Sequence, residues 1–311
     1  MTHANPILNP SSKQLDHLTS LKNLSTSDIH EILDRGDYYV TQNSSRQKKC
    51  SLLSGKTIIN VFLENSTRTR LSFEIAAQRL GADVVTMGVD GSSLQKGESL
   101  VDTLHTLNAM QPDALILRHS ENIAPKLAEK HCFCPILNAG NGTDEHPTQA
   151  LLDALTIRQV YGRLDGLTIA ICGDIKHSRV AHSNQILLEK MGANIHFIGP
   201  EELLPHDQKN TFTSMAEGLK NADIVMVLRL QKERMRQTLS MSEETYFNQY
   251  GLTHEKLSAA KENAFIMHPG PMNRGIEIAS DVAGDPKRSL ILRQVENGVA
   301  IRMSCLDLLL S

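Results

Sequence analysis

The feature that most constrains the fold of this chain is a hydrophobic segment that turns directly into a helix N-terminus. Residues 57–63 are apolar and rich in β-branched side chains, and polar residues follow at positions 64 and 65. A helical pattern then continues to a break at Gly81. A buried strand that leads straight into a helix is typical of βαβ units. The segment therefore predicts an α/β protein with a parallel sheet.

The residues at this corner indicate a site for a phosphate group. They read Ser66-Thr67-Arg68-Thr69-Arg70, three hydroxyl groups interleaved with two guanidinium groups. The N-terminus of a helix offers free backbone N–H groups and the positive end of the helix dipole. Hydroxyl donors and a bidentate guanidinium at the same point strengthen the preference for an anion. The alternative, an ordinary Ser or Thr N-cap, needs only one hydroxyl.

The alternation of strand and helix patterns continues along the chain and indicates two α/β domains. Four strands are expected in the first half and four in the second, at residues 57–63, 84–87, 114–117, 135–138, 168–172, 194–198, 224–228 and 265–267. Residues 148–161 form a helix that we expect to connect the domains. A charged stretch at residues 231–237 leads into a long polar segment, and a helix at about 298–310 closes the chain. In such folds a ligand binds at the carboxyl ends of the strands, and we expect it in the cleft between the two sheets.

Composition excludes several classes of protein. A length of 311 residues suits two domains, and 40% hydrophobic content is ordinary for a globular protein. The net charge of −3 gives no global sign of nucleic-acid binding. No apolar run is long enough to span a bilayer, and residues 1–20 lack the apolar region of a signal peptide, which favours the cytoplasm.

The cysteines predict neither disulfides nor a metal site. There are five, and their odd number and scatter argue against a disulfide framework. The pair Cys132 and Cys134 lacks the spacing of zinc ligands, and no second pair follows. We therefore expect no metal and no cofactor.

Cations and turn residues gather where the predicted strands end. They are Arg118, His146-Pro-Thr-Gln149, Arg179, Arg229 with Gln231, and His268-Pro269-Gly270-Pro271. Each has an ordinary structural explanation when taken singly. Together they describe an arginine-lined site in a chain of net negative charge, which would concentrate small polyanions. A dinucleotide site after the strand at 168–172 is disfavoured, since the G-x-G-x-x-G pattern is absent.

Two motifs carry a resemblance to a known family. Ser66-Thr-Arg-Thr-Arg70 with Ser72-Phe73-Glu74, and His146-Pro-Thr-Gln149, resemble the carbamoyl-phosphate signatures of the aspartate and ornithine carbamoyltransferases. The resemblance runs from about His17 to the C-terminus. The His-Cys-Leu-Pro and Ser-Met-Gly motifs of the ornithine enzymes are absent, and residues 229–234 resemble the loop of the aspartate-specific members.

The resemblance implies a role for each matching residue. Ser66, Thr67, Arg68 and Thr69 would bind the phosphate; Arg118 and His146 would bind the carbonyl oxygen; and Gln149 with the turn Pro269, Gly270 and Pro271 would bind the carbamoyl NH₂. Arg179, Arg229 and Gln231 would bind aspartate, together with Lys96. Lys96 would enter the site of a neighbouring subunit, together with either Ser92 or Ser93. Arg68, Thr69, Lys96, Arg118 and His146 form the implied catalytic set.

The same resemblance implies architecture and partners. It predicts two doubly wound parallel-sheet domains joined by a helix, with a C-terminal helix packing back on the first domain. The expected bounds are residues 1–150 for carbamoyl phosphate, 151–290 for aspartate, and 291–311 for the returning helix. The expected assembly is a homotrimer with shared active sites, able to join dihydroorotase or regulatory chains, without nucleic acid or membrane. A carbamoyltransferase for another amine such as ornithine, or an inactive assembly partner of the same fold, remains as an alternative.

Overall fold

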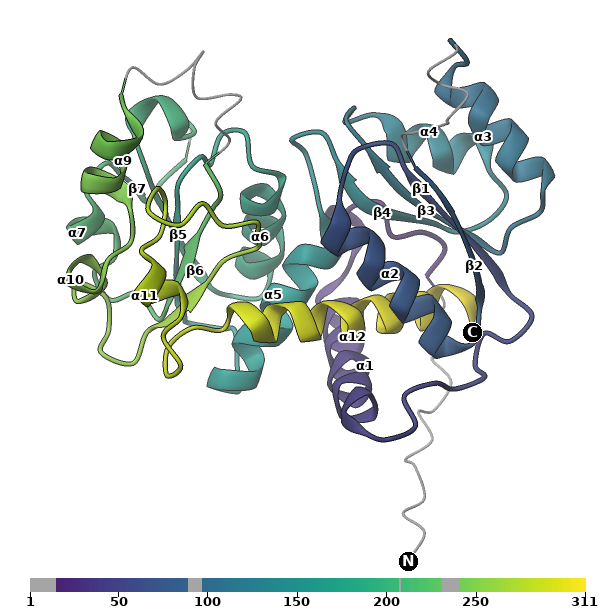
Figure 1. The fold of residues 1–311 in the computed structure, drawn as a ribbon, viewed down its shortest axis with the longest axis horizontal. Coiled ribbons are helices and arrows are strands. Elements are labelled where there is room, and N and C mark those ends of the chain that lie inside the picture. The colour runs from purple at the N-terminus through teal and green to yellow at the C-terminus, as the bar shows by residue number, and fades with distance from the viewer. Residues whose placement is uncertain (1–14, 89–96, 207, 231–240) are drawn as a thin grey trace, which may run out of the picture. The chain divides into compact units, whose positions relative to one another are not determined.

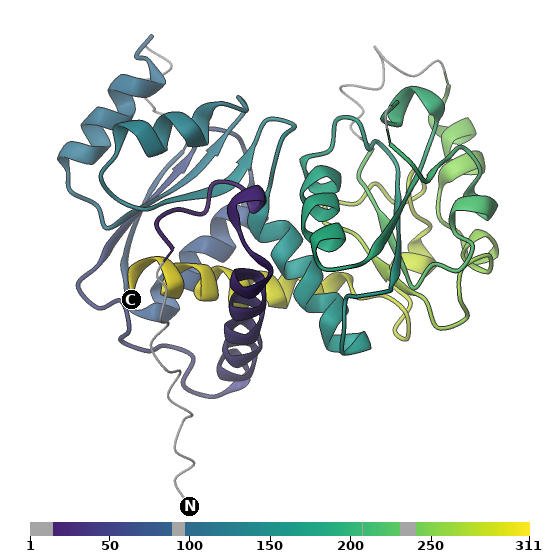
Figure 2. The same cartoon turned by 180° about the vertical axis from the view of Figure 1, so that it is seen from behind.

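The computed structural model describes residues 15–88, 97–206, 208–230 and 241–311 (Figures 1 and 2). The chain divides into two compact units. The first comprises Met1–Gly142 together with Gly298–Ser311, and the second comprises Thr143–Asn297. Each unit is built around a sheet whose strands are all parallel, as the strand and helix alternation predicts.

The sheet of the first unit has the strand order β2-β1-β3-β4. Its strands are β1 (Thr57–Phe62), β2 (Asp83–Met87), β3 (Ala114–His119) and β4 (Ile136–Asn141). Because β1 pairs with β2 on one side and β3 on the other, the connections leave these two central strands in opposite directions. The carboxyl ends of β1 and β3 are therefore the topological switch point of this sheet.

Helices cover both faces of this sheet. On one face, α3 (Leu100–Ala109) and α4 (Ala124–His131) pack against a buried cluster that includes Ile59, Val61 and Leu115. On the other, α2 (Thr67–Leu80) buries Phe73, Ala77 and Leu80 and is joined to β2 by a hydrogen bond from Thr86 to Glu74. Helix α1 (Thr26–Ser44) begins with a capping box between Ser25 and Asp28, and the short 3₁₀ helix η1 (Leu21–Asn23) precedes it.

The sheet of the second unit has the strand order β7-β6-β5-β8-β9. The strands are β5 (Thr168–Cys172), β6 (Asn194–Ile198), β7 (Thr211–Phe212), β8 (Ile224–Val227) and β9 (Phe265–Met267). Here the switch point lies between β5 and β8, which are adjacent in the sheet but lead to opposite edges. One face buries side chains of β5, β8 and β9 in a single hydrophobic cluster. The helices that cover this cluster include α7 (Met215–Gly218), α9 (Glu243–Tyr250) and α10 (His254–Leu257).

The helices of the second unit alternate with these strands. They are α5 (Pro147–Tyr161), α6 (Arg179–Lys190), η3 (Glu201–Leu203), α7 (Met215–Gly218), α9 (Glu243–Tyr250), α10 (His254–Leu257) and α11 (Ser280–Ala283). Helix α5 is buried along most of its length, with Pro147 at its N-terminus as the sequence predicts. Its left-handed C-cap, Gly162, ends it at a position with φ +72° that favours glycine.

The closing helix α12 (Ile291–Leu310) contributes to both units. Its first part belongs to the second unit, where Asn297 donates hydrogen bonds to Thr156 and Gln159 on α5. Its later part belongs to the first unit, where it lies beside α1 in both views (Figures 1 and 2) and Ser304 donates to the carbonyl oxygen of Ile32. The arginine Arg302 also lies over the ring of Phe73 on α2, 4.8 Å from its centroid. The C-terminal helix therefore packs on the first unit, as expected.

Several elements differ in extent from the sequence prediction. Helix α12 starts at Ile291, where the family resemblance places the returning helix and seven residues before the start that the local pattern predicts. Its first turns are stabilised by packing on α5, while Asn297 and Gly298 weaken the local helix signal. Strand β4 continues to Asn141, beyond the expected end at residue 138. The polar segment after residue 240 contains α9 and α10, each with a side-chain N-cap, Ser242 and Thr253.

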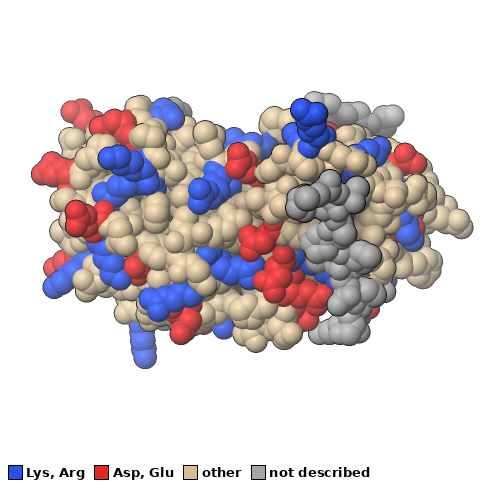
Figure 3. Space-filling model, turned by 90° about the horizontal axis from the view of Figure 1, so that it is seen from below, with Lys and Arg blue, Asp and Glu red and all other residues tan. Residues whose placement is uncertain are grey.

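Charges of both signs are present on the surface. On the face drawn in Figure 3, Lys and Arg side chains lie interspersed with Asp and Glu side chains. Within the described ranges, no helix combines the length and apolar character needed to cross a membrane.

Candidate functional site

The phosphate corner predicted from the sequence lies at the switch point of the first sheet. Helix α2 begins at Thr67 with Ser66 as its N-cap, and the Ser66 side chain makes no capping hydrogen bond. The hydroxyl at this position is thus not used as an ordinary N-cap. Thr67 and Arg68 are exposed and Thr69 is buried. The first turn of α2 carries Arg68 and Arg70 and no acidic side chain, so an anion at its free N–H groups would meet no like charge within that turn.

Arg118 lies beside this corner because β3 pairs with β1. The register places Arg118 opposite Phe62, and the N–H of Leu63 donates to the carbonyl oxygen of Arg118 at 2.9 Å. The Arg118 side chain is 9% exposed. Its Nη1 donates to the carbonyl oxygen of Ala139 at 3.1 Å, and its Nη2 to Glu64 at 3.0 Å. The structure therefore brings Arg118 and residues 66–69 together, and it holds the guanidinium in a defined orientation.

An irregularity in the sheet contributes to the placement of Arg118. The register between β3 and β4 shifts between Leu117 and His119, so that Ala139 and Gly140 together oppose Arg118. Gly140 has φ +118°, which favours glycine. Bulges of this kind redirect side chains at the ends of strands. The neighbouring His119 has its pKa lowered by burial, partly offset by Glu121 and Glu64, so its imidazole is neutral at neutral pH.

The second sheet carries its own cation at its switch point. Arg229 lies two residues after the end of β8. Between them, the N–H of Leu228 donates to the carbonyl oxygen of Cys172, at the end of β5, at 2.8 Å. A Cβ at Gly173 would approach Leu228 to 3.3 Å, so a glycine allows the two strand ends to lie this close. Arg179 is the first residue of α6, after the N-cap Ser178.

His146 and Gln149 lie at the start of α5, within the second unit. His146 is the N-cap and is 5% exposed, and its backbone N–H donates to Ser183 Oγ on α6 at 2.7 Å. Gln149 is 8% exposed, and its Nε2 donates to Asp153 one turn further along α5, at 3.0 Å. The start of α5 is therefore attached to α6 and to a buried carboxylate.

The turn at residues 269–271 is organised by the buried residue before it. His268 Nδ1 accepts the N–H of Gly270 at 2.8 Å, and its Nε2 lies 3.3 Å from Glu277 Oε1. Both side chains of this pair are fully buried. Glu277 also accepts the N–H groups of Asn273 and Leu230, and Leu230 adjoins Arg229. The pair thus ties the turn to the segment that carries Arg229.

Comparison with known families agrees with this arrangement. Residues 16–159 match the model of the aspartate/ornithine carbamoyltransferase carbamoyl-phosphate-binding domain, and residues 165–309 match that of its aspartate/ornithine-binding domain. The chain belongs to the aspartate/ornithine carbamoyltransferase family.

The relatives of this carbamoyltransferase include both branches of the family. The aspartate carbamoyltransferase catalytic subunit of Rhodospirillum centenum is 57% identical over 94% of this chain and 93% of its own. A crystal structure of aspartate transcarbamoylase from Trypanosoma cruzi with N-(phosphonacetyl)-L-aspartic acid matches at 34% identity and TM-score 0.87, covering 97% and 98% of the two chains. The ornithine carbamoyltransferase of Pyrococcus furiosus has TM-score 0.86 but 25% identity, covering 98% and 99%. The fold is therefore common to both branches, and sequence separates them.

Four of the predicted site residues, Ser92, Ser93, Lys96 and Gln231, lie outside the described residues. Sequence reasoning missed three buried residues that hydrogen-bond to predicted site residues or their neighbours in the second unit: Asp153, Glu277 and Gln294. The spacing of Gln149 and Asp153 on one helix was the available signal, since residues four apart share a helix face. Within the described ranges, no group of three or more His, Cys, Asp or Glu side chains is arranged to hold a metal ion.

Proposed function

We propose that the chain is an aspartate carbamoyltransferase, which transfers the carbamoyl group of carbamoyl phosphate to the α-amine of L-aspartate. The products are N-carbamoyl-L-aspartate and phosphate. One observation carries the proposal: identity to a curated aspartate carbamoyltransferase catalytic subunit is 57% across nearly the whole chain. In this role the enzyme would serve de novo pyrimidine synthesis in the cytoplasm.

The negative charge of each substrate is complementary to cationic side chains near the switch point of one sheet. The phosphate would bind the N–H groups of α2 with Ser66, Thr67, Arg68 and Thr69. Aspartate carries two carboxylates, which Arg179 and Arg229 would bind, with Gln231 beside them. The carbamoyl NH₂ would meet Gln149 and the carbonyl groups of the 269–271 turn. The two anionic substrates repel each other in water, so holding them together is itself a large part of catalysis.

The chemical step requires no covalent intermediate with the enzyme. The amine of aspartate attacks the carbamoyl carbon, a tetrahedral oxyanion forms, and phosphate leaves as that intermediate collapses. Arg118, Thr69 and His146 would donate to the oxyanion, and each such donor stabilises a transition state by about 3 kcal/mol. The departing phosphate can accept the amine proton, so no side-chain base is needed.

A direct assay tests the proposal. Purified protein is mixed with carbamoyl phosphate and L-aspartate, and both carbamoyl-aspartate and phosphate are measured. Release of the two products in equal amounts supports the assignment. Turnover of L-ornithine in place of L-aspartate would instead support the ornithine branch, and no turnover of either amine would support an inactive assembly partner.

Replacing Arg229 by alanine should weaken aspartate binding and leave carbamoyl-phosphate binding nearly unchanged. The reason is that Arg229 follows β8 in the second sheet, whereas the phosphate corner belongs to the first. We expect KM for aspartate to rise about 100-fold, the effect of losing one charged hydrogen-bonded contact. Calorimetric titration with carbamoyl phosphate provides the control. An equal loss of affinity for both substrates would contradict this division of roles.

The proposal includes a homotrimer in which each site receives Lys96 from a neighbouring subunit. Lys96→Ala and Arg68→Ala trimers should each be nearly inactive. In a cyclic trimer every hybrid then contains one interface with both residues intact. Random reassociation of equal amounts should restore about a quarter of native activity, because about three quarters of the trimers are hybrids with one good site in three.

Native mass spectrometry checks that hybrids have formed. Activity that stays at the level of the separate variants, in a sample shown to contain hybrids, would rule out the shared site. The same measurement on the unmodified protein reports its oligomeric state, and mixing with dihydroorotase or regulatory chains tests for a larger assembly.

A further inference from the structure

A buried carboxylate lies behind the residue proposed to recognise the carbamoyl NH₂. Asp153 is fully buried on α5. Its Oδ1 accepts hydrogen bonds from Gln149 Nε2 at 3.0 Å and from Gln294 Nε2 at 2.8 Å. Its Oδ2 accepts from Asn184 Nδ2 at 2.9 Å. Three amide groups from α5, α6 and α12 therefore converge on one acidic side chain.

This carboxylate determines which way the Gln149 amide faces. Oδ1 of Asp153 is the acceptor for the side-chain amide groups of both Gln149 and Gln294, so the group of Gln149 that faces it is the NH₂. The amide is planar, and Oε1 therefore lies on the branch directed away from the carboxylate. A ligand that reaches Gln149 from that side meets an acceptor. Such an acceptor suits an N–H group and offers nothing to a methyl group of the same size.

The same network reaches the second group proposed to contact the NH₂. With its Nε2 on Asp153, Gln294 presents Oε1 to the backbone N–H of His268, at 2.9 Å. His268 in turn accepts the N–H of Gly270 through Nδ1. An unbroken series of hydrogen bonds thus leads from Gln149 through Asp153, Gln294 and His268 to the turn that contains Pro269 and Gly270.

We propose that Asp153 and Gln294 are positioning residues that make the enzyme select carbamoyl phosphate over acyl phosphates that lack an N–H group. Asp153 holds the Gln149 amide with its oxygen toward the ligand, and Gln294 fixes the start of the 269–271 turn through the backbone N–H of His268. This inference rests on the proposed function, because it specifies how that site would recognise the transferred group.

Acetyl phosphate is the probe, since a methyl group replaces the NH₂ of carbamoyl phosphate. Selectivity is measured as the ratio of the inhibition constant of acetyl phosphate to KM for carbamoyl phosphate, at fixed aspartate. In the Asp153→Asn variant, the new amide can donate a hydrogen bond to Gln149 Oε1. The Gln149 amide would then rotate by about 180°, so that its NH₂ instead of its oxygen faces the ligand. We expect KM for carbamoyl phosphate to rise about 10- to 100-fold, the cost of opposing two donors in a buried site. The inhibition constant of acetyl phosphate should change less than about threefold.

Asp223→Asn is the matched control. Asp223 is also a buried aspartate of the second unit, 4% exposed, but it accepts the N–H of Thr168 and pairs with Lys261 at the amino ends of β5 and β8. Asp223→Asn therefore removes a buried carboxylate at the opposite ends of the strands from the switch point. We expect a lower melting temperature and no change in the selectivity ratio.

The outcomes separate the two proposals. If the unmodified enzyme fails to carbamoylate aspartate, the proposed function is wrong, and this appears before any variant is made. If it is active, and Asp153→Asn affects the two phosphates equally while still binding inorganic phosphate normally, the positioning role is overturned. If Asp153→Asn does not fold, Gln294→Met decides. Gln294→Met keeps the side-chain volume but removes the hydrogen bond to the His268 N–H. It should lower the selectivity ratio by disturbing the 269–271 turn alone. An unchanged selectivity ratio in this variant would overturn the inference.

Discussion

Replacing Arg118 by alanine is expected to lower kcat about 100- to 1,000-fold, the usual effect of removing one donor to an oxyanion. Arg118 is buried at the switch point of the first sheet and is oriented by Ala139 and Glu64. A guanidinium held in this way can donate two hydrogen bonds at once to phosphate and carbonyl oxygens. Steady-state kinetics with both substrates saturating measure the effect.

Two further variants sharpen this result. Arg118→Lys should recover little activity, because an ammonium group is a point charge that cannot reproduce the planar fork. Arg46→Ala removes an arginine from an exposed loop and should leave kcat within about twofold of native, as most surface substitutions do. A near-normal kcat for Arg118→Ala in a folded protein would refute the assignment of Arg118 to the reacting group.

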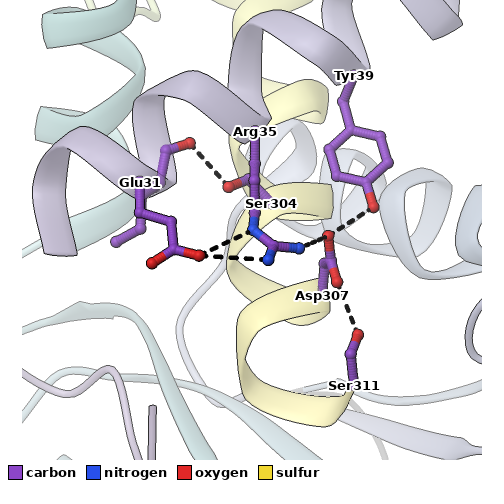
Figure 4. Close-up of polar contacts among 7 residues, drawn as sticks. Glu31, Arg35, Tyr39, Ser304, Asp307 and Ser311 are labelled. Atoms are coloured by element: carbon purple, nitrogen blue, oxygen red, sulfur yellow. Dashed lines mark hydrogen bonds and ion pairs between the residues drawn. The ribbon is translucent and has the colours of Figure 1, made fainter. Parts of the chain in front are cut away.

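The largest effect on stability is expected from the buried ion pair between α1 and α12 (Figure 4). Arg35 Nη1 lies 2.6 Å from Asp307 Oδ2, and their side chains are 7% and 3% exposed. Tyr39 also donates to Asp307, at 2.9 Å. Burial alone disfavours the charged guanidinium, but the hydrogen bonds and charges of Asp307 and Glu31 outweigh it and raise the pKa of Arg35.

Arg35→Ala should therefore lower the free energy of unfolding by about 3–5 kcal/mol, because it leaves the Asp307 carboxylate buried without its cation. Denaturant unfolding, followed by circular dichroism, measures the loss. Glu31→Ala is the control: Glu31 also contacts Arg35, but its side chain is 37% exposed, so we expect a change below about 1 kcal/mol.

A double variant tests the cause. Arg35→Met combined with Asp307→Leu removes both charges and keeps apolar volume, and it should be clearly more stable than Arg35→Ala alone. If the double variant were less stable than the single one, the uncompensated carboxylate would not be the source of the loss. Packing of the C-terminal helix would then have to explain it.

The sequence by itself determined the elements and residues whose signals are local. Strands β5, β6 and β9 begin and end where hydrophobic pattern predicts, because each is a short apolar run bounded by polar or turn residues. The junction of strand β1 with helix α2 was recognisable for the same reason: strand, hydroxyl groups and helix start are contiguous in the chain. The phosphate site at residues 66–69 stays a prediction. That the arginines after the strands of one sheet lie at the same edge was predictable from topology alone, because parallel strands place their carboxyl ends together.

Only the tertiary structure decided the contacts between distant residues. The pairs Asp153 with Gln294 and Arg35 with Asp307 are separated by 141 and 272 positions, and no local pattern marks them. The bulge opposite Arg118 and the early start of α12 likewise depend on neighbouring elements. The physical reason is that a buried polar side chain is stabilised by whichever partner the packed fold brings within hydrogen-bonding distance.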